Sequence, residues 1–235
     1  LKRKSAEGAG VSHWLKKYFD EYAMLVWLVI YWAISIESTL NIGVRHLLPA
    51  FPFMIILVSG QIMKFKTYTK DRISHGHAFR FVMPTVIVAL LGWYIFENIS
   101  IYPHYLAYFN QVAGGPAGGY KYVDDSNLDW GQELVRFSDW VKENNIKKIG
   151  FDYFGWADPS YFLGNRYEYV NSTKYKDADD FMKRNDTDGW IAVSYTFLNR
   201  AGGLSDSPRY PNYDWLKARE PITIIGYSIY VYRIQ

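Results

Sequence analysis

Apolar residues are concentrated in three runs within the first 100 residues of the chain. The runs cover about residues 22–40, 47–63 and 81–97. Each is close to the lower end of the roughly 17–25 residues that a helix needs to cross the apolar core of a bilayer. The pattern therefore predicts a transmembrane region over residues 1–100. Three buried helices of a water-soluble protein are the alternative interpretation.

Beyond residue 100, short apolar stretches alternate with polar ones. Residues 101–127 predict an interfacial helix and a Gly-rich connector, and residues 128–235 a folded domain. Strands are predicted at residues 147–154, 167–170, 189–195 and within 221–234, and helices or helical turns at 128–144, 158–163, 177–184 and 213–219. Strands that alternate with helices predict a small α/β sheet. An arrangement with all helices on one face stays open.

Basic residues flank the apolar runs unevenly. They precede the first run and separate the second from the third: Lys2, Arg3, Lys4, Lys16, Lys17, and then Lys64, Lys66, Lys70, Arg72 and Arg80. The link at residues 37–46 carries only Arg45. Cytoplasmic loops of membrane proteins collect Lys and Arg. The N-terminus and a loop at residues 64–80 are therefore predicted to be cytoplasmic. The 37–46 link and everything after about residue 97 are predicted to lie outside, so they share one face of the membrane.

Composition narrows the function classes. The net charge of +3 is small, which gives no indication of a nucleic-acid partner. The chain has no cysteine, which excludes disulfides and thiolate metal sites within it. Aromatic residues make up 19% of the chain, with 21 tyrosines. Tyrosine suits surfaces that are partly apolar and partly wet, such as membrane interfaces and sugar-contacting clefts.

The outer link places ionisable side chains at the edge of the apolar layer. Glu37, Arg45 and His46 stand there, where charged groups usually mark a functional site or pair with one another. The planar guanidinium of Arg45 is suited to gripping a lipid phosphate, with His46 as a second donor. The alternative is that Arg45 reaches the headgroups or neutralises Glu37. Pro49 and Pro52 are predicted to interrupt the second helix near its outer end.

The segment after the third run reads YPHYLAYFN at residues 102–110. Its aromatic residues fall at helical spacing and predict an anchor at headgroup depth: Tyr102, Tyr105, Tyr108 and Phe109. His104 and Asn110 are the polar groups in this belt and are the candidates for substrate contact. The following AGGPAGGY at residues 113–120 predicts a loop and matches no phosphate-binding fingerprint.

Acidic and amide residues follow in VDDSNLDWGQ at residues 123–132. One interpretation gives Asp124, Asp125, Asn127 and Asp129 a role in binding sugar hydroxyls or a divalent cation, although the stretch lacks the later residues of an EF-hand. The other is that Ser126 and Asp129 only cap the helix predicted at 128–144. A glycosidase pair of Asp125 or Asp129 with Glu133 is not favoured by the spacing. Asp129 and Glu133 are neighbours on the predicted helix, which more often indicates a solvated face.

Four stretches together resemble one family. They are NIGVRHLLPAFPF at 41–53, YPHYLAYFN with its Gly-rich sequel, DSNLDWGQEL at 125–134 and IGYSIYVYRI at 225–234. They resemble bacterial membrane glycosyltransferases of the protein O-mannosyltransferase and aminoarabinose-transferase type, which are similar to glycosyltransferase family 39 and have the GT-C fold. The resemblance covers most of residues 41–234, and DSNLDWGQ is its most specific motif.

The resemblance implies a multi-pass protein of the bacterial inner membrane with a periplasmic C-terminal domain. Such enzymes transfer a sugar from a polyprenyl-phosphate donor to a lipid, glycan or protein acceptor on the outer face. Their catalytic acid lies in the first outer loop, which has no counterpart in this chain. The resemblance therefore implies a C-terminal portion that has no catalytic residue of its own and is inactive alone. No cofactor is implied beyond the divalent cation considered above.

A different class of function stays open. The chain can be a non-catalytic, membrane-anchored binding or assembly module, as the missing loop and the aromatic-rich outer domain suggest. Part of a transporter is not favoured, because three spans without internal repeats do not match transporter architecture.

Overall fold

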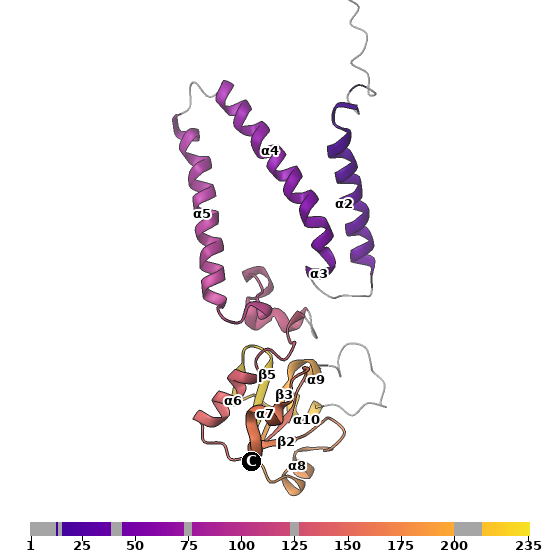
Figure 1. Ribbon diagram of the computed structural model, residues 1–235, viewed down its shortest axis with the longest axis vertical. Coiled ribbons are helices and arrows are strands. Elements are labelled where there is room, and N and C mark those ends of the chain that lie inside the picture. Colours follow the sequence, from indigo (N-terminus) through magenta and orange to yellow (C-terminus); the bar gives the residue numbers. More distant parts are fainter. Residues whose placement is uncertain (1–12, 14–15, 39–43, 73–76, 123–126, 200–212) are drawn as a thin grey trace, which may run out of the picture. The chain divides into compact units, whose positions relative to one another are not determined.

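The computed structural model describes residues 13, 16–38, 44–72, 77–122, 127–199 and 213–235 (Figure 1). The chain divides into two compact units, Leu1–Tyr94 and Ile95–Gln235. The first unit is helical, and the second contains a β-sheet with helices. The last turns of the third long helix belong to the second unit.

The helical unit consists of long apolar helices joined by short elements. Its elements in chain order are α2 (Phe19–Glu37), α3 (Val44–Leu47), η1 (Leu48–Ala50), α4 (Phe51–Arg72) and the first part of α5 (His77–Ile101). Within the described residues, three stretches are long and apolar enough to cross a membrane, namely Phe19–Glu37, Val44–Lys64 and Pro84–Ile101. The predicted count of three apolar helices is therefore confirmed.

Two details of this region differ from or refine the prediction. The predicted loop at residues 64–80 is wrong over most of its length, because α4 continues to Arg72 and α5 begins at His77. The apolar pattern locates only the part of a helix that suits lipid. Here the polar residues next to the apolar runs continue the same helices. The predicted interruption near the prolines is confirmed, since η1 contains Pro49 and separates α3 from α4.

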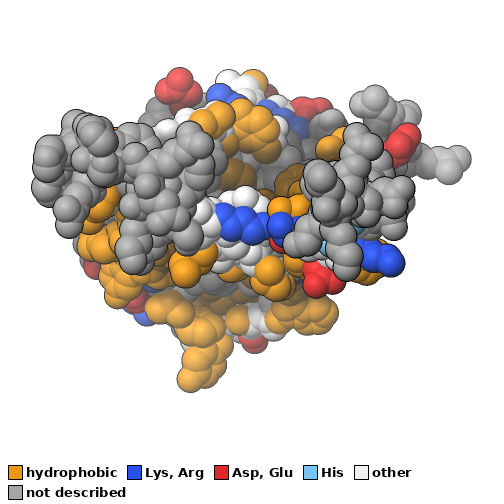
Figure 2. Space-filling model, turned by 90° about the horizontal axis from the view of Figure 1, so that it is seen from above, with side chains coloured by type: hydrophobic (Ala, Val, Ile, Leu, Met, Phe, Trp, Pro, Cys, Tyr) orange, Lys and Arg blue, Asp and Glu red, His pale blue; other side chains and the backbone are white. Residues whose placement is uncertain are grey.

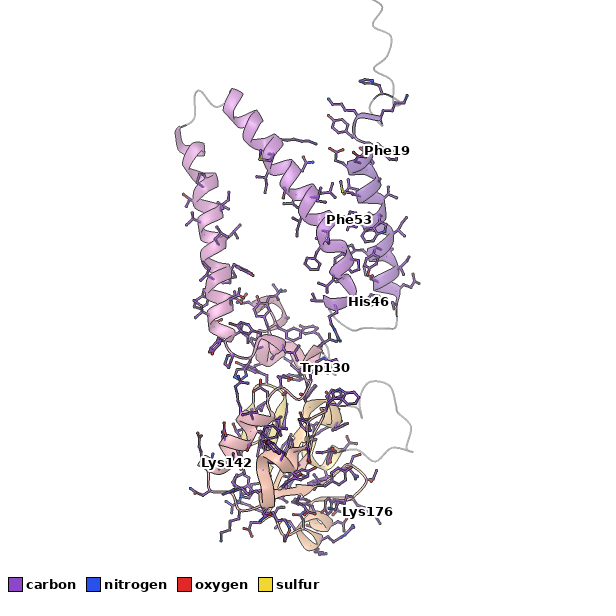
Figure 3. All side chains as sticks on the ribbon, viewed as in Figure 1. Phe19, His46, Phe53, Trp130, Lys142 and Lys176 are labelled. Atoms are coloured by element: carbon purple, nitrogen blue, oxygen red, sulfur yellow. The ribbon has the colours of Figure 1, made fainter. Side chains whose placement is uncertain are left out.

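Helices α2 and α4 pack through aromatic side chains. Phe53 on α4 lies against α2 (Figure 3), with its ring centroid 4.6 Å from that of Trp27. Trp27 in turn stacks on Tyr31 at 4.9 Å. The Tyr31 hydroxyl donates a hydrogen bond to the backbone carbonyl of His46. This contact ties α3 to the C-terminal part of α2.

The apolar side chains of the helical unit are mostly exposed. Among its residues whose burial is described, Leu28 and Ala50 are the buried hydrophobic ones. Hydrophobic side chains are orange in the space-filling view of the whole chain, where they lie at the surface among charged and polar ones (Figure 2). Contiguous exposed apolar surface on this scale marks a protein or membrane contact. The helices therefore need an apolar neighbour that the unit itself does not supply.

The second unit is built on a five-stranded mixed sheet of order β2-β1-β3-β5-β4. Its strands are β1 (Ile149–Asp152), β2 (Tyr167–Tyr169), β3 (Trp190–Ser194), β4 (Thr223–Ile225) and β5 (Ile229–Arg233). Strand β1 is parallel to both β2 and β3. Strand β5 is antiparallel to β3 and to β4.

Helices cover both faces of the sheet, each over its own apolar cluster. Helices α6 (Leu134–Glu143) and α7 (Pro159–Leu163) pack on one face. Helices α8 (Ala178–Arg184) and α10 (Asp214–Lys217) pack on the other. Neighbouring residues of β3 alternate between the two clusters, as a strand buried on both faces requires. The arrangement with all helices on one face is excluded.

Most elements predicted in this unit are confirmed within a few residues. Two predictions are wrong. The helix expected at residues 128–144 begins only at Leu134, because Gly131 has a left-handed φ of 76° that ends helical geometry before it. The loop predicted at residues 113–120 is largely a 3₁₀ helix, η4 (Pro116–Lys121). Strand β3 is followed directly by a short helix, α9 (Tyr195–Asn199).

Candidate functional site

The connector after α5 packs on the edge of the sheet where the parallel strands end. The Tyr195 hydroxyl, just past β3, donates to the carbonyl of Tyr120 at 3.1 Å. The Tyr153 hydroxyl, just past β1, donates to the carbonyl of Gly131 at 2.9 Å. Strand β1 lies between β2 and β3, so the connections diverge at this edge. Open α/β sheets bind ligands at such a divergence point, beyond the carboxyl ends of the strands.

A buried carboxylate lies at this edge of the sheet, against the turn between β4 and β5. The Glu133 side chain is 1% exposed and holds two basic groups at once. Its Oε1 lies 2.9 Å from Nδ1 of His104, and its Oε2 lies 3.1 Å from Nη1 of Arg136. Since an ionised carboxylate only accepts hydrogen bonds, Nδ1 of His104 carries the proton. The Nε2 atom of the same ring takes no part in this contact.

The turn between β4 and β5 fixes this group from one side. Gly226 has a φ of 55°, and a Cβ placed on it would lie 2.0 Å from Cδ of Glu133. Tyr227 follows with a φ of 64°, and its ring packs edge-on against His104 at 5.7 Å. A non-glycine residue in this conformation is strained, and such strain often accompanies functional sites. The hairpin turn therefore holds both Glu133 and His104 in place.

The acidic motif is buried at the same edge. Asp129 and Glu133 are both 0% exposed, so the interpretation of these acids as a solvated helix face is wrong. Asp129 Oδ1 accepts from the backbone N–H of Gly131 at 2.8 Å, in a turn that precedes the helix. Burial raises the pKa of the Tyr153 hydroxyl, and the nearby charge of Asp129 adds to the increase. Asn127 is half-buried, whereas Asp124, Asp125 and Ser126 lie outside the described residues.

A second buried acid stands where α5 ends. Glu97 is 6% exposed and accepts a hydrogen bond from Nε2 of Gln111. Tyr108 also contacts it. Burial, followed by the hydrogen bond to Glu97, raises the pKa of Tyr108. Asn110 accepts from the backbone N–H of Ala113 at 3.1 Å, so it caps the short helix η3 (Gln111–Ala113). Glu97 thus joins the end of α5 to the connector.

The outer-link candidates belong to the helical unit. Glu37 is the exposed last residue of α2, and Arg45 is exposed on α3. His46 is half-buried, and its backbone accepts from Tyr31. His104 and the acidic motif belong to the other unit, so the prediction that all these residues form one site stays a prediction.

Sequence reasoning missed Glu97, Arg136 and Tyr227 and misjudged Glu133. The spacing of Glu133 and Arg136 by three residues is a signal for an ion pair on a helix. The partner His104 lies 29 residues away from Glu133, which no local pattern indicates. Within the described part of the chain, no group of three or more His, Asp or Glu side chains is placed to hold a metal ion.

In chemical terms, the cluster offers one protonatable ring nitrogen and a guanidinium beside it. Such a pair can donate to an oxyanion, or the neutral ring can accept from a hydroxyl. In comparisons with known proteins, no family model, no curated protein and no solved structure matches the chain.

Proposed function

We propose that the chain is the C-terminal portion of an integral-membrane glycosyltransferase. In this proposal, the enzyme transfers a sugar from a polyprenyl-phosphate donor to a lipid, glycan or protein acceptor. The reaction takes place on the outer face of a bacterial inner membrane, where the sheet unit lies.

The apolar helices support the membrane part of the proposal. Three helices have the length and composition of spans, and their exposed side chains suit lipid or further helices. The basic flanks orient them with the 37–46 link and the sheet unit on the same side.

One observation carries the proposal furthest. The stretch 125–134 contains the most specific motif, DSNLDWGQ, and its acids Asp129 and Glu133 are buried at the sheet edge onto which the connector from α5 folds, whereas Trp130 is exposed. A surface loop would have no need of buried acids, which are costly unless they are held by partners. The buried acids therefore serve to fix the connector on the sheet, which supports a well-defined outer domain.

The chemistry follows from the donor. An acceptor hydroxyl attacks the anomeric carbon, the bond to the polyprenyl phosphate breaks, and the phosphate leaves with the electron pair. A general base from the part of the enzyme that carries the first outer loop takes the hydroxyl proton. Negative charge develops on the leaving phosphate, so a cation aimed at it lowers the barrier. Arg45 is assigned this role, with His46 as a second donor.

The experiment compares two cations of the second span in the full-length enzyme. Arg45→Ala is expected to lower the rate of sugar transfer about 10²–10³-fold, as the loss of a charge-stabilising group does. Lys64→Gln is the matched control. Lys64 forms an exposed ion pair with Glu21 at 3.0 Å near the opposite end of that span, so transfer should be unchanged. Full activity of Arg45→Ala would favour a non-catalytic, membrane-anchored module instead.

A further inference from the structure

We propose that His104 and Arg136 form a binding site for the phosphate group of a membrane lipid, and that the buried carboxylate of Glu133 holds both side chains in position. The site is distinct in its residues from the Arg45 group. It rests on the proposed function only for the position of α5 in a membrane, and it does not require sugar transfer.

The first argument is charge. Two basic side chains contact the two oxygens of a single carboxylate, at 2.9 Å for His104 and 3.1 Å for Arg136. Arg136 is always charged and balances Glu133 by itself. Arg136 is therefore the permanent cation of the group, and an imidazolium at His104 would present Nε2–H as a second donor. A phosphate is an anion whose oxygens accept from both kinds of donor.

The second argument is exposure. The carboxylate is 1% exposed, whereas the side chain of His104 is 23% exposed and that of Arg136 is 42% exposed. Arginine has five N–H groups in a planar fork, and the contact with Glu133 uses one nitrogen, Nη1. The outer parts of both groups are thus open to an oxyanion, while their shared counter-ion is shielded from solvent.

The third argument is preorganisation. The backbone at Gly226 blocks movement of Glu133 on one side, and the ring of Tyr227 packs against His104. Neither basic group has to be recruited from a disordered side chain. Binding therefore costs less ordering entropy than binding to freely moving surface lysines.

The fourth argument identifies a lipid as the source of the phosphate. His104 lies three residues beyond the end of α5 at Ile101. Its neighbours Tyr102 and Tyr105 are exposed, as is Ile99 in the last turns of the helix. Exposed tyrosines at the end of an apolar helix mark headgroup depth, which is where lipid phosphates lie. Free phosphate would need no such apolar surroundings.

The test measures lipid binding to the full chain purified in detergent micelles. Native mass spectrometry follows the fraction bound during titration with phosphatidylglycerol, and with diacylglycerol as the lipid without phosphate. Arg136→Gln and His104→Asn are each expected to weaken phosphatidylglycerol binding about tenfold or more, because each removes one charge-assisted contact with the phosphate. Diacylglycerol should bind weakly to every variant.

Lys142→Gln is the matched control, because it removes a positive charge from the same helix, α6. Lys142 lies on the outside of α6 (Figure 3) and pairs only loosely with Asp139, at 3.7 Å. Its replacement should leave the affinity unchanged. Equal losses in all three variants would overturn the site in favour of general surface charge. Wild-type affinity in Arg136→Gln would also overturn it. This variant keeps the test decisive if His104→Asn fails to fold, because the Arg136 side chain is exposed.

A competition arm separates the sources of phosphate. Inorganic phosphate at the same concentration as the lipid should displace little phosphatidylglycerol. Equal displacement would overturn the lipid assignment. The double variant should lose less than the product of the two single losses if both side chains contact one phosphate. Sugar transfer is not measured in this experiment, so its outcome is independent of the test on Arg45.

Discussion

The two units of this chain are both rich in apolar residues but place them in opposite ways. In the sheet unit, apolar side chains fill two clusters on the two faces of the sheet. Among the hydrophobic residues of the helical unit whose burial is described, the buried ones are Leu28 and Ala50. The sheet unit therefore carries its own core. The helical unit needs lipid or other helices to cover it, so the same apolar substitution should have different effects in the two.

A similar contrast separates the two basic groups. Arg45 stands exposed on a four-residue helix. His104 and Arg136 share a buried counter-ion that is itself packed against a hairpin turn. Preorganisation is thus present in the sheet unit before any ligand arrives.

The largest expected effect comes from emptying the core of the sheet unit. Phe137 is fully buried, with its ring centroid 4.3 Å from that of Phe151. Phe137→Ala is expected to lower the free energy of unfolding by about 3–5 kcal/mol, through lost burial and the cavity left behind. The measurement is denaturant unfolding followed by near-ultraviolet circular dichroism. Leu91→Ala, at an exposed position on α5, should cost less than about 0.5 kcal/mol. A comparable loss at Leu91 would break the contrast between the units.

Two glycines, one in each unit, extend this comparison to the backbone. Gly189 has a φ of 81°, and a Cβ there would lie 2.1 Å from the carbonyl oxygen of Ile234. Gly189→Ala should lower the free energy of unfolding by about 3 kcal/mol. The strained backbone conformation costs about 1–3 kcal/mol, and the clash with the Ile234 carbonyl adds to it. Gly92 on α5 has no atom within 4 Å of such a Cβ. Gly92→Ala should therefore stabilise its helix by about 0.5–1 kcal/mol. Thermal unfolding in detergent measures both, and destabilisation at Gly92 would reveal close helix packing.

A smaller effect concerns a buried polar contact and its dependence on pH. The Tyr213 hydroxyl donates to Oδ2 of Asp152 at 2.7 Å. Burial, followed by the charge of Asp152, raises the pKa of Tyr213 well above its ordinary value of 10.0. The resulting stability is complete below about pH 10 and is lost as the pH rises further, because only the unfolded chain then releases the proton. Tyr213→Phe should cost about 1.5–3 kcal/mol at neutral pH.

The control for this prediction is internal to the titration. The stability of Tyr213→Phe should fall less steeply than that of the wild type above pH 10, because the variant lacks the hydroxyl whose pKa is raised in the folded chain. Parallel curves for the two proteins would show that the hydroxyl of Tyr213 does not titrate with unfolding.

The sequence predicts local structure in this chain better than it predicts the candidate site. Strands such as β3 and helices such as α8 follow from apolar spacing and from capping residues like Asp177, which accepts from the N–H of Asp180 at 2.8 Å. The late start of α6 depends on the left-handed φ of Gly131, and a glycine within an apolar periodic stretch does not show which conformation it takes. The burial of Glu133 depends on His104 and Gly226, which are distant in sequence.

The order of strands has a consequence for how the protein is made. Strand β5 lies between β3 and β4, although it comes last among the described strands. Until Ile229–Arg233 has left the ribosome, β3 has an open edge that can pair with another chain. At about 5–20 residues per second, the stretch from residue 149 to 233 takes roughly 4–17 s to synthesise. During biogenesis the three apolar helices therefore emerge first, and the edge of β3 stays exposed until β5 has been synthesised.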